Sequence, residues 1–289
     1  MRISSRPASV PVASGVLIAS LAIGFVIASA VCAYLLVAVG GYAGTAAAFA
    51  VNSLVCFALP GFVSRVVAVG TGMWSGVGRD PFSVIGLVIL LTMACQPFLE
   101  FTSSMDAFCA SALGVPDDLA RANKEMLGGV CLFDSVGHWA VAILVLAILP
   151  AVSEELFFRG AFLPLLRRAT GSWHVAVFVS AVVFSAVHMD PSGFITRTVL
   201  GLLLGAVFAI TRSLWAPMLL HFTNNAMAVF CLSLTADPVE ALSAERSGQS
   251  IILSVASLVG TMALIYLLQQ NERKNWTLTS IFKKNNPDR

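Results

Sequence analysis

The stretch AVSEELFFRGAF, residues 151–162, places two adjacent glutamates and an arginine in an apolar neighbourhood. An ionisable residue inside a transmembrane helix costs at least ~2.5–3.5 kcal/mol on insertion scales, so such residues are usually functional and usually paired. Further along the chain, His188, His221 and the pair Asn224 and Asn225 lie in equally apolar surroundings. These positions are therefore the candidates for a site that does chemistry.

Helical spacing assigns partners to the acidic cluster. Glu155 and Arg159 are four residues apart with the acid first, which is the favourable order for an ion pair on one helix face. Glu154 is rotated by about 100° from that face, so its carboxylate stays available for another partner. A structural ion pair, or an arginine that extends to the membrane interface, would also explain Glu155 and Arg159. Neither explains why Glu154 is acidic as well.

The same spacing applies to the two histidines. Phe184 and His188 are four residues apart, so an aromatic ring is expected beside that imidazole. His221 and Asn225 are also four residues apart, which places two hydrogen-bonding groups on one helix face. With a rise of ~1.5 Å per residue, these groups and Glu154 could all reach one depth in the membrane.

Together these side chains suit the hydrolysis of a peptide bond. A carboxylate and an imidazole facing one cavity can hold and activate a water molecule. A second histidine with an asparagine can donate hydrogen bonds to the oxyanion that forms when this water attacks an amide carbonyl. Glu154, His188 and His221 could equally bind a divalent metal such as zinc, which would lower the pKa of a bound water.

Three motifs now carry a resemblance to a known family. EELFFR matches EExxxR, FSAVH matches FxxxH, and HFTNN matches HxxxN, in this order over roughly residues 137–234. This pattern resembles the CPBP family, the intramembrane CAAX-processing and bacteriocin-processing endopeptidases that are also called the Abi family.

The resemblance implies a membrane-embedded helical peptidase in which Glu154 and His188 activate water while His221 and Asn225 stabilise the oxyanion. The supporting residues that it implies are Glu155, Arg159 and Phe184. Members are widely labelled metalloproteases, but a metal-free glutamate mechanism is also argued for the family, so the metal remains open. Eukaryotic relatives remove the last three residues of prenylated CAAX proteins, which implies a peptide or protein substrate that is membrane-associated or lipidated.

Composition predicts the element type that must position these residues. Of 289 residues, 58% are hydrophobic and 11% are charged, with a mean hydropathy of +0.88, well outside the range of soluble domains. Continuous apolar runs predict helices, because lipid offers no partner to backbone groups. We expect an all-α polytopic membrane protein with about eight transmembrane helices and a four-helix catalytic core. The expected spans are roughly 14–39, 43–69, 82–104, 137–167, 173–189, 197–212, 214–234 and 250–270.

Basic residues predict the orientation and the domain limits. With eight spans and an inside N-terminus, most of the 17 Lys and Arg residues fall on the cytoplasmic half, so both termini of this multi-pass cell-membrane protein are predicted to be cytoplasmic. We divide the chain into N-terminal transmembrane helices with an outer loop (1–136), a CPBP-like catalytic core (137–234), and a last transmembrane helix with a basic cytoplasmic tail (235–289). No basic stripe interleaved with aromatic residues indicates nucleic acid, so membrane lipids and a peptide substrate are the expected partners.

Two other classes of function remain open. A transporter would also bury Glu, His and Asn at one depth, although the halves of this sequence show no internal symmetry. A non-catalytic family member, serving in bacteriocin immunity or as a scaffold, would keep the fold without turnover. Other intramembrane proteases are disfavoured because the sequence has no HExxH, GxGD or GxSG motif.

Overall fold

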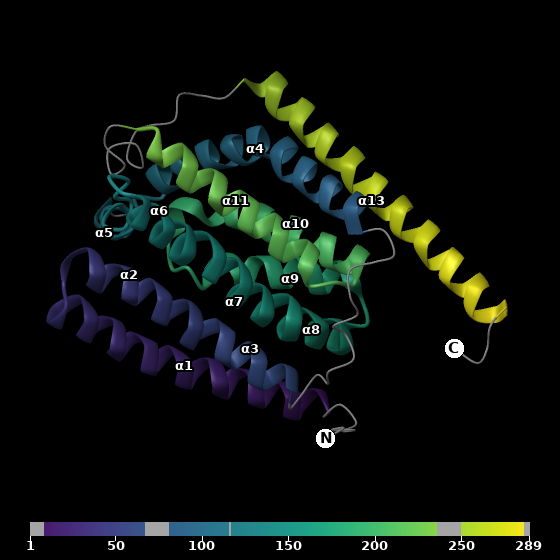
Figure 1. The fold of residues 1–289 in the computed structure, drawn as a ribbon, viewed down its shortest axis with the longest axis horizontal. Helices are drawn as coiled ribbons and strands as arrows, with labels where there is room; N and C mark the ends of the chain where they lie inside the picture. Colours follow the sequence, from purple (N-terminus) through teal and green to yellow (C-terminus); the bar gives the residue numbers. More distant parts are fainter. Residues whose placement is uncertain (1–8, 67–80, 116, 236–249, 286–289) are drawn as a thin grey trace.

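The computed structural model describes residues 9–66, 81–115, 117–235 and 250–285, and within these ranges every regular element is a helix (Figure 1). The all-α, polytopic class expected from composition is confirmed. Six helices of the described residues are long and apolar enough to cross a membrane. They are Val10–Ala38, Gly41–Ser64, Phe82–Ala112, Val136–Thr170, Pro191–Thr211 and Ile251–Lys274.

The expected number of eight spans is therefore two too high by length and composition. Expected spans five and seven are the helices α9 (Trp173–Ala186) and α11 (Trp215–Ser233). With 14 residues, α9 is shorter than the ~20 residues that a bilayer core needs. The length of α11 suffices, but His221, Asn224 and Asn225 lower its hydropathy.

The N-terminal part is a pair of antiparallel helices. The first is α1 (Val10–Ala38), and the second is continuous through α2 (Gly41–Val51), the π-helical segment η1 (Asn52–Ala58) and α3 (Leu59–Ser64). The next helices are α4 (Pro81–Ala112) and the amphipathic α5 (Asp117–Gly128). Residues 105–112 thus continue a helix where the sequence indicated a polar loop.

One long helix carries the acidic cluster. It runs through α6 (Val136–Ile143), η4 (Leu144–Ile148), α7 (Leu149–Phe157), η5 (Phe158–Phe162) and α8 (Leu163–Thr170). After α9, a 3-10 turn η6 (Pro191–Gly193) leads into α10 (Phe194–Thr211), α11 and finally α13 (Ile251–Asn285).

Prolines explain the π-helical segments. Each of η1, η4 and η5 ends two residues before a proline, namely Pro60, Pro150 and Pro164. A proline inside a helix donates no N–H, and its ring clashes with the carbonyl of the residue four positions earlier. A locally widened helix relieves that clash and leaves a carbonyl free for another donor.

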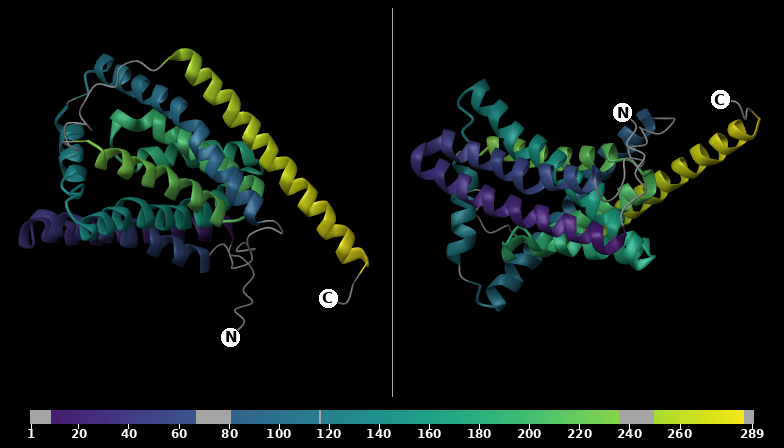
Figure 2. Two further views of the ribbon diagram at one scale, coloured as in Figure 1. Left: turned by 45° about the horizontal axis from the view of Figure 1, so that its top comes forward. Right: turned by 90° about the horizontal axis from the view of Figure 1, so that it is seen from below.

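The long helix lies in the middle of the bundle. In Figure 1, α1–α3 lie on one side of α7–α11, and α4 with α13 lies on the other. The left view of Figure 2 shows the same order from a second direction. Two glycines of the stretch GLLLG pack closely on α9, because a Cβ added to Gly201 would lie 3.0 Å from Ala181 Cα, and one added to Gly205 would lie 2.9 Å from Val177 Cγ1. Small residues thus bring α10 against α9.

Both ends of the chain lie partly outside the described residues. Residues 1–8 and 286–289 are not described, so the cytoplasmic location of the two termini stays a prediction. The same holds for Arg79, Asp237, Glu240, Glu245 and Arg246, on which part of the orientation argument rested.

Candidate active site

The predicted ion pair of the acidic cluster is present and fully buried. Arg159 Nη1 lies 2.8 Å from Glu155 Oε1, and neither side chain is exposed to solvent. The other terminal nitrogen of Arg159 donates to the carbonyl oxygen of Gly201 at 2.9 Å. One arginine therefore neutralises the adjacent acid and ties the long central helix to α10.

Glu155 has a second partner that spacing alone did not indicate. His221 Nδ1, on α11, lies 3.1 Å from the same Oε1 atom. The helix face that His221 shares with Asn225 on α11 thus meets a carboxylate of α7. Because the carboxylate oxygen only accepts, Nδ1 of His221 carries the proton, and Nε2 is the atom left for other partners.

Glu154 is the carboxylate left over, as the helical geometry indicated. It is 8% exposed, and its Oε2 atom is buried without a hydrogen-bond partner. It interacts electrostatically with both Arg159 and His188. Oε2 of Glu155 is likewise buried without a partner, but Oε1 of Glu155 is held by Arg159 and His221, so among the described residues Glu154 is the one of the two acids that no ion pair fixes.

His188 follows the end of α9 and has a defined tautomer. Its Nδ1 lies 2.8 Å from the carbonyl oxygen of Phe184, which can only accept, so Nδ1 carries the proton. In the neutral ring, Nε2 then has the free electron pair. The residue is exposed, in contrast to His221, which is 3% exposed.

Phe184 holds three members of the site together. Its ring centroid lies 5.2 Å from that of His188 and 5.9 Å from that of His221, both edge-on. The guanidinium carbon of Arg159 lies 5.1 Å from the centre of the same ring. The predicted contact with His188 is confirmed, and the same ring also contacts His221 and Arg159.

Asn225 is bonded to the central helix rather than to His221. Its Nδ2 donates to the carbonyl oxygen of Leu146 at 3.1 Å, and its Oδ1 accepts from Asn224 Nδ2 at 3.2 Å. Leu146 lies four residues before Pro150, which has no N–H to offer that carbonyl. The proline thus makes an acceptor for Asn225.

Gln96 extends this chain of amides, and sequence reasoning missed it. Its Nε2 donates to Asn224 Oδ1 at 3.1 Å. An amide side chain in the apolar helix α4, directly before Pro97, was the available signal.

The second proline of the central helix is used in the same way. Gly160 lies four residues before Pro164, and its carbonyl oxygen accepts from Arg65 Nη1 at 3.1 Å. We expected Gly160 to let another chain approach, but a Cβ there would meet only ordinary contacts at 3.7 Å. Its carbonyl, rather than its missing side chain, is what the fold uses.

A constrained turn follows His188. Met189 has a left-handed backbone with φ of 52°, which is uncommon for a residue with a side chain. Arg197 Nη1 lies 3.1 Å from Asp190 Oδ2, and Arg197 also donates to the backbone oxygen of Asp190. Burial raises the pKa of Asp190, but the hydrogen bond from Ser192 and the charge of Arg197 outweigh it, so the pKa is lowered and the carboxylate is ionised.

Asp106 of α4 fixes the start of the next helix. Its carboxylate accepts from the backbone N–H of Ile195 at 2.7 Å, and from the N–H and hydroxyl of Thr196 at 2.9 and 2.7 Å. Asp106 is 1% exposed, so it is a buried acid whose hydrogen bonds satisfy the first turn of α10. Sequence reasoning missed Asp106, Asp190 and Arg197, because their roles depend on how α4 meets the turn.

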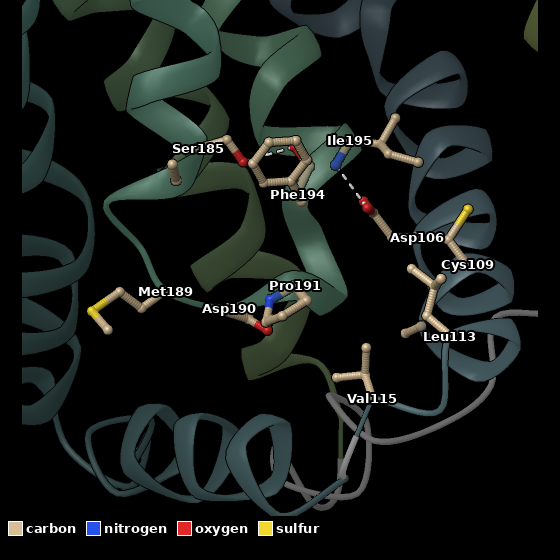
Figure 3. A pocket seen from close by; sticks show the side chains of 12 residues that line it. Asp106, Cys109, Leu113, Val115, Ser185, Met189, Asp190, Pro191, Phe194 and Ile195 are labelled. Carbon is tan, nitrogen blue, oxygen red and sulfur yellow. Dashed lines mark hydrogen bonds between the residues drawn. The ribbon is translucent and has the colours of Figure 1, made fainter.

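A pocket of about 500 Å³ opens beside this turn (Figure 3). The end of α4, the end of α9 and the start of α10 contribute its walls, and Met189 and Asp190 bring it next to His188. The structure thus brings Glu154, Glu155, Arg159, Phe184, His188 and His221 together, and the pocket lies beside the turn that follows His188, with none of these six residues in its wall.

A metal at Glu154, His188 and His221 stays a prediction. Within the described ranges, no three His, Cys, Asp or Glu side chains are grouped so that they could hold an ion. The bond from His221 to Glu155 uses Nδ1 and leaves Nε2 open.

Comparisons with known proteins agree with the motifs. Residues 136–227 match the family model "Type II CAAX prenyl endopeptidase Rce1-like". The resemblance to CAAX-processing endopeptidases is thereby confirmed for this segment, which contains all the candidate site residues.

Two relatives from Bacillus subtilis (strain 168) are similar to part of the chain. "Putative membrane peptidase YdiL" is 26% identical over 106 residues, which is 37% of this chain and 43% of the relative. "Uncharacterized protein YpbD" is 29% identical over 89 residues, which is 29% of this chain and 42% of the relative. The chain thus spans less than half the length of these curated relatives. No solved structure matches it.

Proposed function

We propose that this protein is an intramembrane endopeptidase that hydrolyses a peptide bond with a water molecule activated by Glu154 and His188. The observation that carries the proposal is the buried Oε2 of Glu154, which has no hydrogen-bond partner and interacts with the open imidazole of His188. The match of the surrounding segment to a CAAX endopeptidase family supports the same reaction.

The two residues divide the proton transfers between them. A water held between the Glu154 carboxylate and His188 Nε2 gives up a proton as its oxygen attacks the carbonyl carbon. The same proton then passes to the amide nitrogen as the carbon–nitrogen bond breaks. His188 suits this role because its Nδ1 is already bonded to the carbonyl of Phe184, which leaves Nε2 with its electron pair.

His221 and Asn225 stabilise the oxyanion in this proposal. The Glu155 carboxylate, 3.1 Å from Nδ1, holds the His221 ring in place, and donation to the oxyanion comes from Nε2 when that nitrogen carries a proton. Asn225 has one amide hydrogen on the carbonyl of Leu146 and a second to offer. Each removed donor of this kind costs about 10²–10³ in rate.

The substrate class follows from where the site lies. The catalytic residues are on helices of a membrane protein, so the substrate is a membrane-associated or lipidated peptide. We further propose a multi-pass protein of the cell membrane with both termini in the cytoplasm, as the distribution of basic residues predicts.

Substitution of the two water-activating residues tests the proposal. Wild type, Glu154→Gln and His188→Ala are purified in detergent, reconstituted in liposomes, and incubated with a mixed library of lipidated and unlipidated peptides. We expect cleavage by the wild type alone, with all three proteins folded. A parallel incubation with chelator reports whether turnover needs a metal.

The same peptide library distinguishes a peptidase from the two other classes of function, a carrier and a non-catalytic family member. A wild type that cleaves no peptide, with variants that lose transport or immunity, would replace the peptidase by a carrier or a non-catalytic family member. Cleavage that survives both substitutions would move the chemistry to other residues.

A further inference from the structure

We propose that the pocket beside His188 binds a large apolar side chain of the substrate close to the bond that is cut, and thereby selects the peptide. This inference rests on the proposed peptidase function. The pocket lies between the end of α4 and the α9–α10 turn (Figure 3).

The polar groups at the pocket wall are already used within the protein. Asp106 accepts three hydrogen bonds from the start of α10, and Asp190 is bonded to Ser192 and Arg197. Ser185 donates its hydroxyl to the carbonyl of Phe194 at 2.7 Å. A polar ligand would find these groups taken, so the pocket recognises hydrocarbon.

The remaining wall is apolar and partly open. It is made by Ala110, Leu113, Met189, Pro191, Phe194 and Ile195. Leu113 is 80% exposed and Met189 is 69% exposed, so the pocket can be reached from outside. Apolar contact removes water from both surfaces and stabilises a bound hydrocarbon group in proportion to the area covered.

The pocket lies beside His188, one of the proposed catalytic residues, along the chain. Met189 and Asp190, the two residues directly after His188, both line it. A peptide whose carbonyl lies at His188 can therefore place a neighbouring side chain in the pocket. The volume of about 500 Å³ is within the usual range for sites of small ligands, so it accommodates an aromatic or long aliphatic side chain.

The cleavage test uses a variant that fills the pocket and a matched control. Ala110→Trp places a large ring in the wall, whereas Ala107→Trp places the same ring on the exposed side of the same helix, away from the pocket. Peptides from the library are resynthesised without lipid, with Ala, Leu, Phe or Trp next to the cut bond. The wild type should cleave the Phe and Trp peptides with kcat/KM roughly tenfold or more above the Ala peptide.

Ala110→Trp should remove this preference, and Ala107→Trp should keep it. Leu113→Ala widens the exposed rim of the pocket, so it should shift the preference from the Phe peptide towards the Trp peptide. This variant tests the pocket by removing side-chain volume instead of adding it. An unchanged ranking of peptides in Ala110→Trp would overturn the proposal. A change confined to lipidated peptides would overturn it as well, because the pocket would then hold the lipid.

A binding measurement separates this proposal from the proposed function. Cys109 is a free, half-buried thiol in the pocket wall, and Cys231 is an exposed thiol on α11. In Glu154→Gln, alkylation at each thiol is followed by mass spectrometry with and without the Trp peptide. We expect the peptide to slow alkylation of Cys109 several-fold and to leave Cys231 unchanged.

The cleavage test and the alkylation test can fail independently of each other. Protection of Cys109 without any cleavage by the wild type would keep the pocket and remove the peptidase. Cleavage without protection, and without a side-chain preference, would keep the peptidase and remove the pocket as its specificity site.

Discussion

Glu155 Oε1 lies 3.1 Å from His221 Nδ1, although the two residues are 66 positions apart. The same oxygen binds Arg159 at 2.8 Å. One carboxylate thus joins a cation of its own helix to an imidazole of α11. Oε2 of both glutamates is buried without a hydrogen-bond partner, but Oε1 of Glu155 is held by a cation and an imidazole, so in the proposed function Glu155 has the structural role and Glu154 the chemical one.

Glutamine at the two positions should have opposite effects. Glu155→Gln leaves the fully buried Arg159 without its counter-charge, and we expect a loss of roughly 3–5 kcal/mol in the free energy of unfolding. Glu154→Gln removes a buried charge that lacks a donor, so stability should be unchanged or higher while cleavage falls by about 10²–10⁴. Thermal unfolding in detergent and peptide cleavage measure the two effects. Equal stability of both variants would contradict this assignment.

Pro150 should matter to catalysis through Asn225. Pro150→Ala supplies an N–H that can bond the Leu146 carbonyl within the helix, so Asn225 loses its acceptor and its orientation. We expect about a tenfold loss of kcat/KM without a loss of stability, by the same reasoning that applies to misplaced oxyanion donors. Pro164→Ala is the control, since the carbonyl it affects binds Arg65 rather than a catalytic residue. Wild-type activity in Pro150→Ala would separate Asn225 from the proposed mechanism.

Phe184 should be more important for activity than its packing alone suggests. Phe184→Leu keeps an apolar side chain but removes the ring between His188, His221 and Arg159, at a cost of about 1–3 kcal/mol in stability. Displaced imidazoles should lower kcat by at least roughly tenfold. Phe162→Leu is the comparison, because its ring packs on the rings of Phe157 and Phe158. A similar loss of activity in both variants would show a general packing effect.

The pair of Asp190 and Arg197 should position His188. Arg197→Ala removes two contacts to the turn that follows the histidine, so kcat should fall, whereas stability should change by only about 1 kcal/mol because the pair is partly exposed. Arg197→Lys should restore part of the activity. A double-mutant cycle with Asp190→Asn should give a coupling of roughly 0.5–3 kcal/mol in transition-state stabilisation. Additive effects would show that the two residues act independently.

Local features of this protein could be predicted from its sequence. The all-helical class follows from composition, because apolar runs in lipid must satisfy their own backbone groups. The pairs Glu155–Arg159 and Phe184–His188 were also predictable, since the residues of each pair are four positions apart, the first within one long helix and the second across the end of α9. The expected eight spans were too many, because apolar character does not reveal where a short helix such as α9 ends.

Contacts between helices depended on the tertiary structure. His221 shares a helix face with Asn225 but binds Glu155, and Asn225 binds a carbonyl that Pro150 leaves open. Asp106 reaches the start of α10 from a helix that carries no family motif. Such contacts depend on the rotation and depth of each helix against its neighbours. Side-chain packing over the whole bundle decides these quantities, and residue spacing within one helix does not contain them.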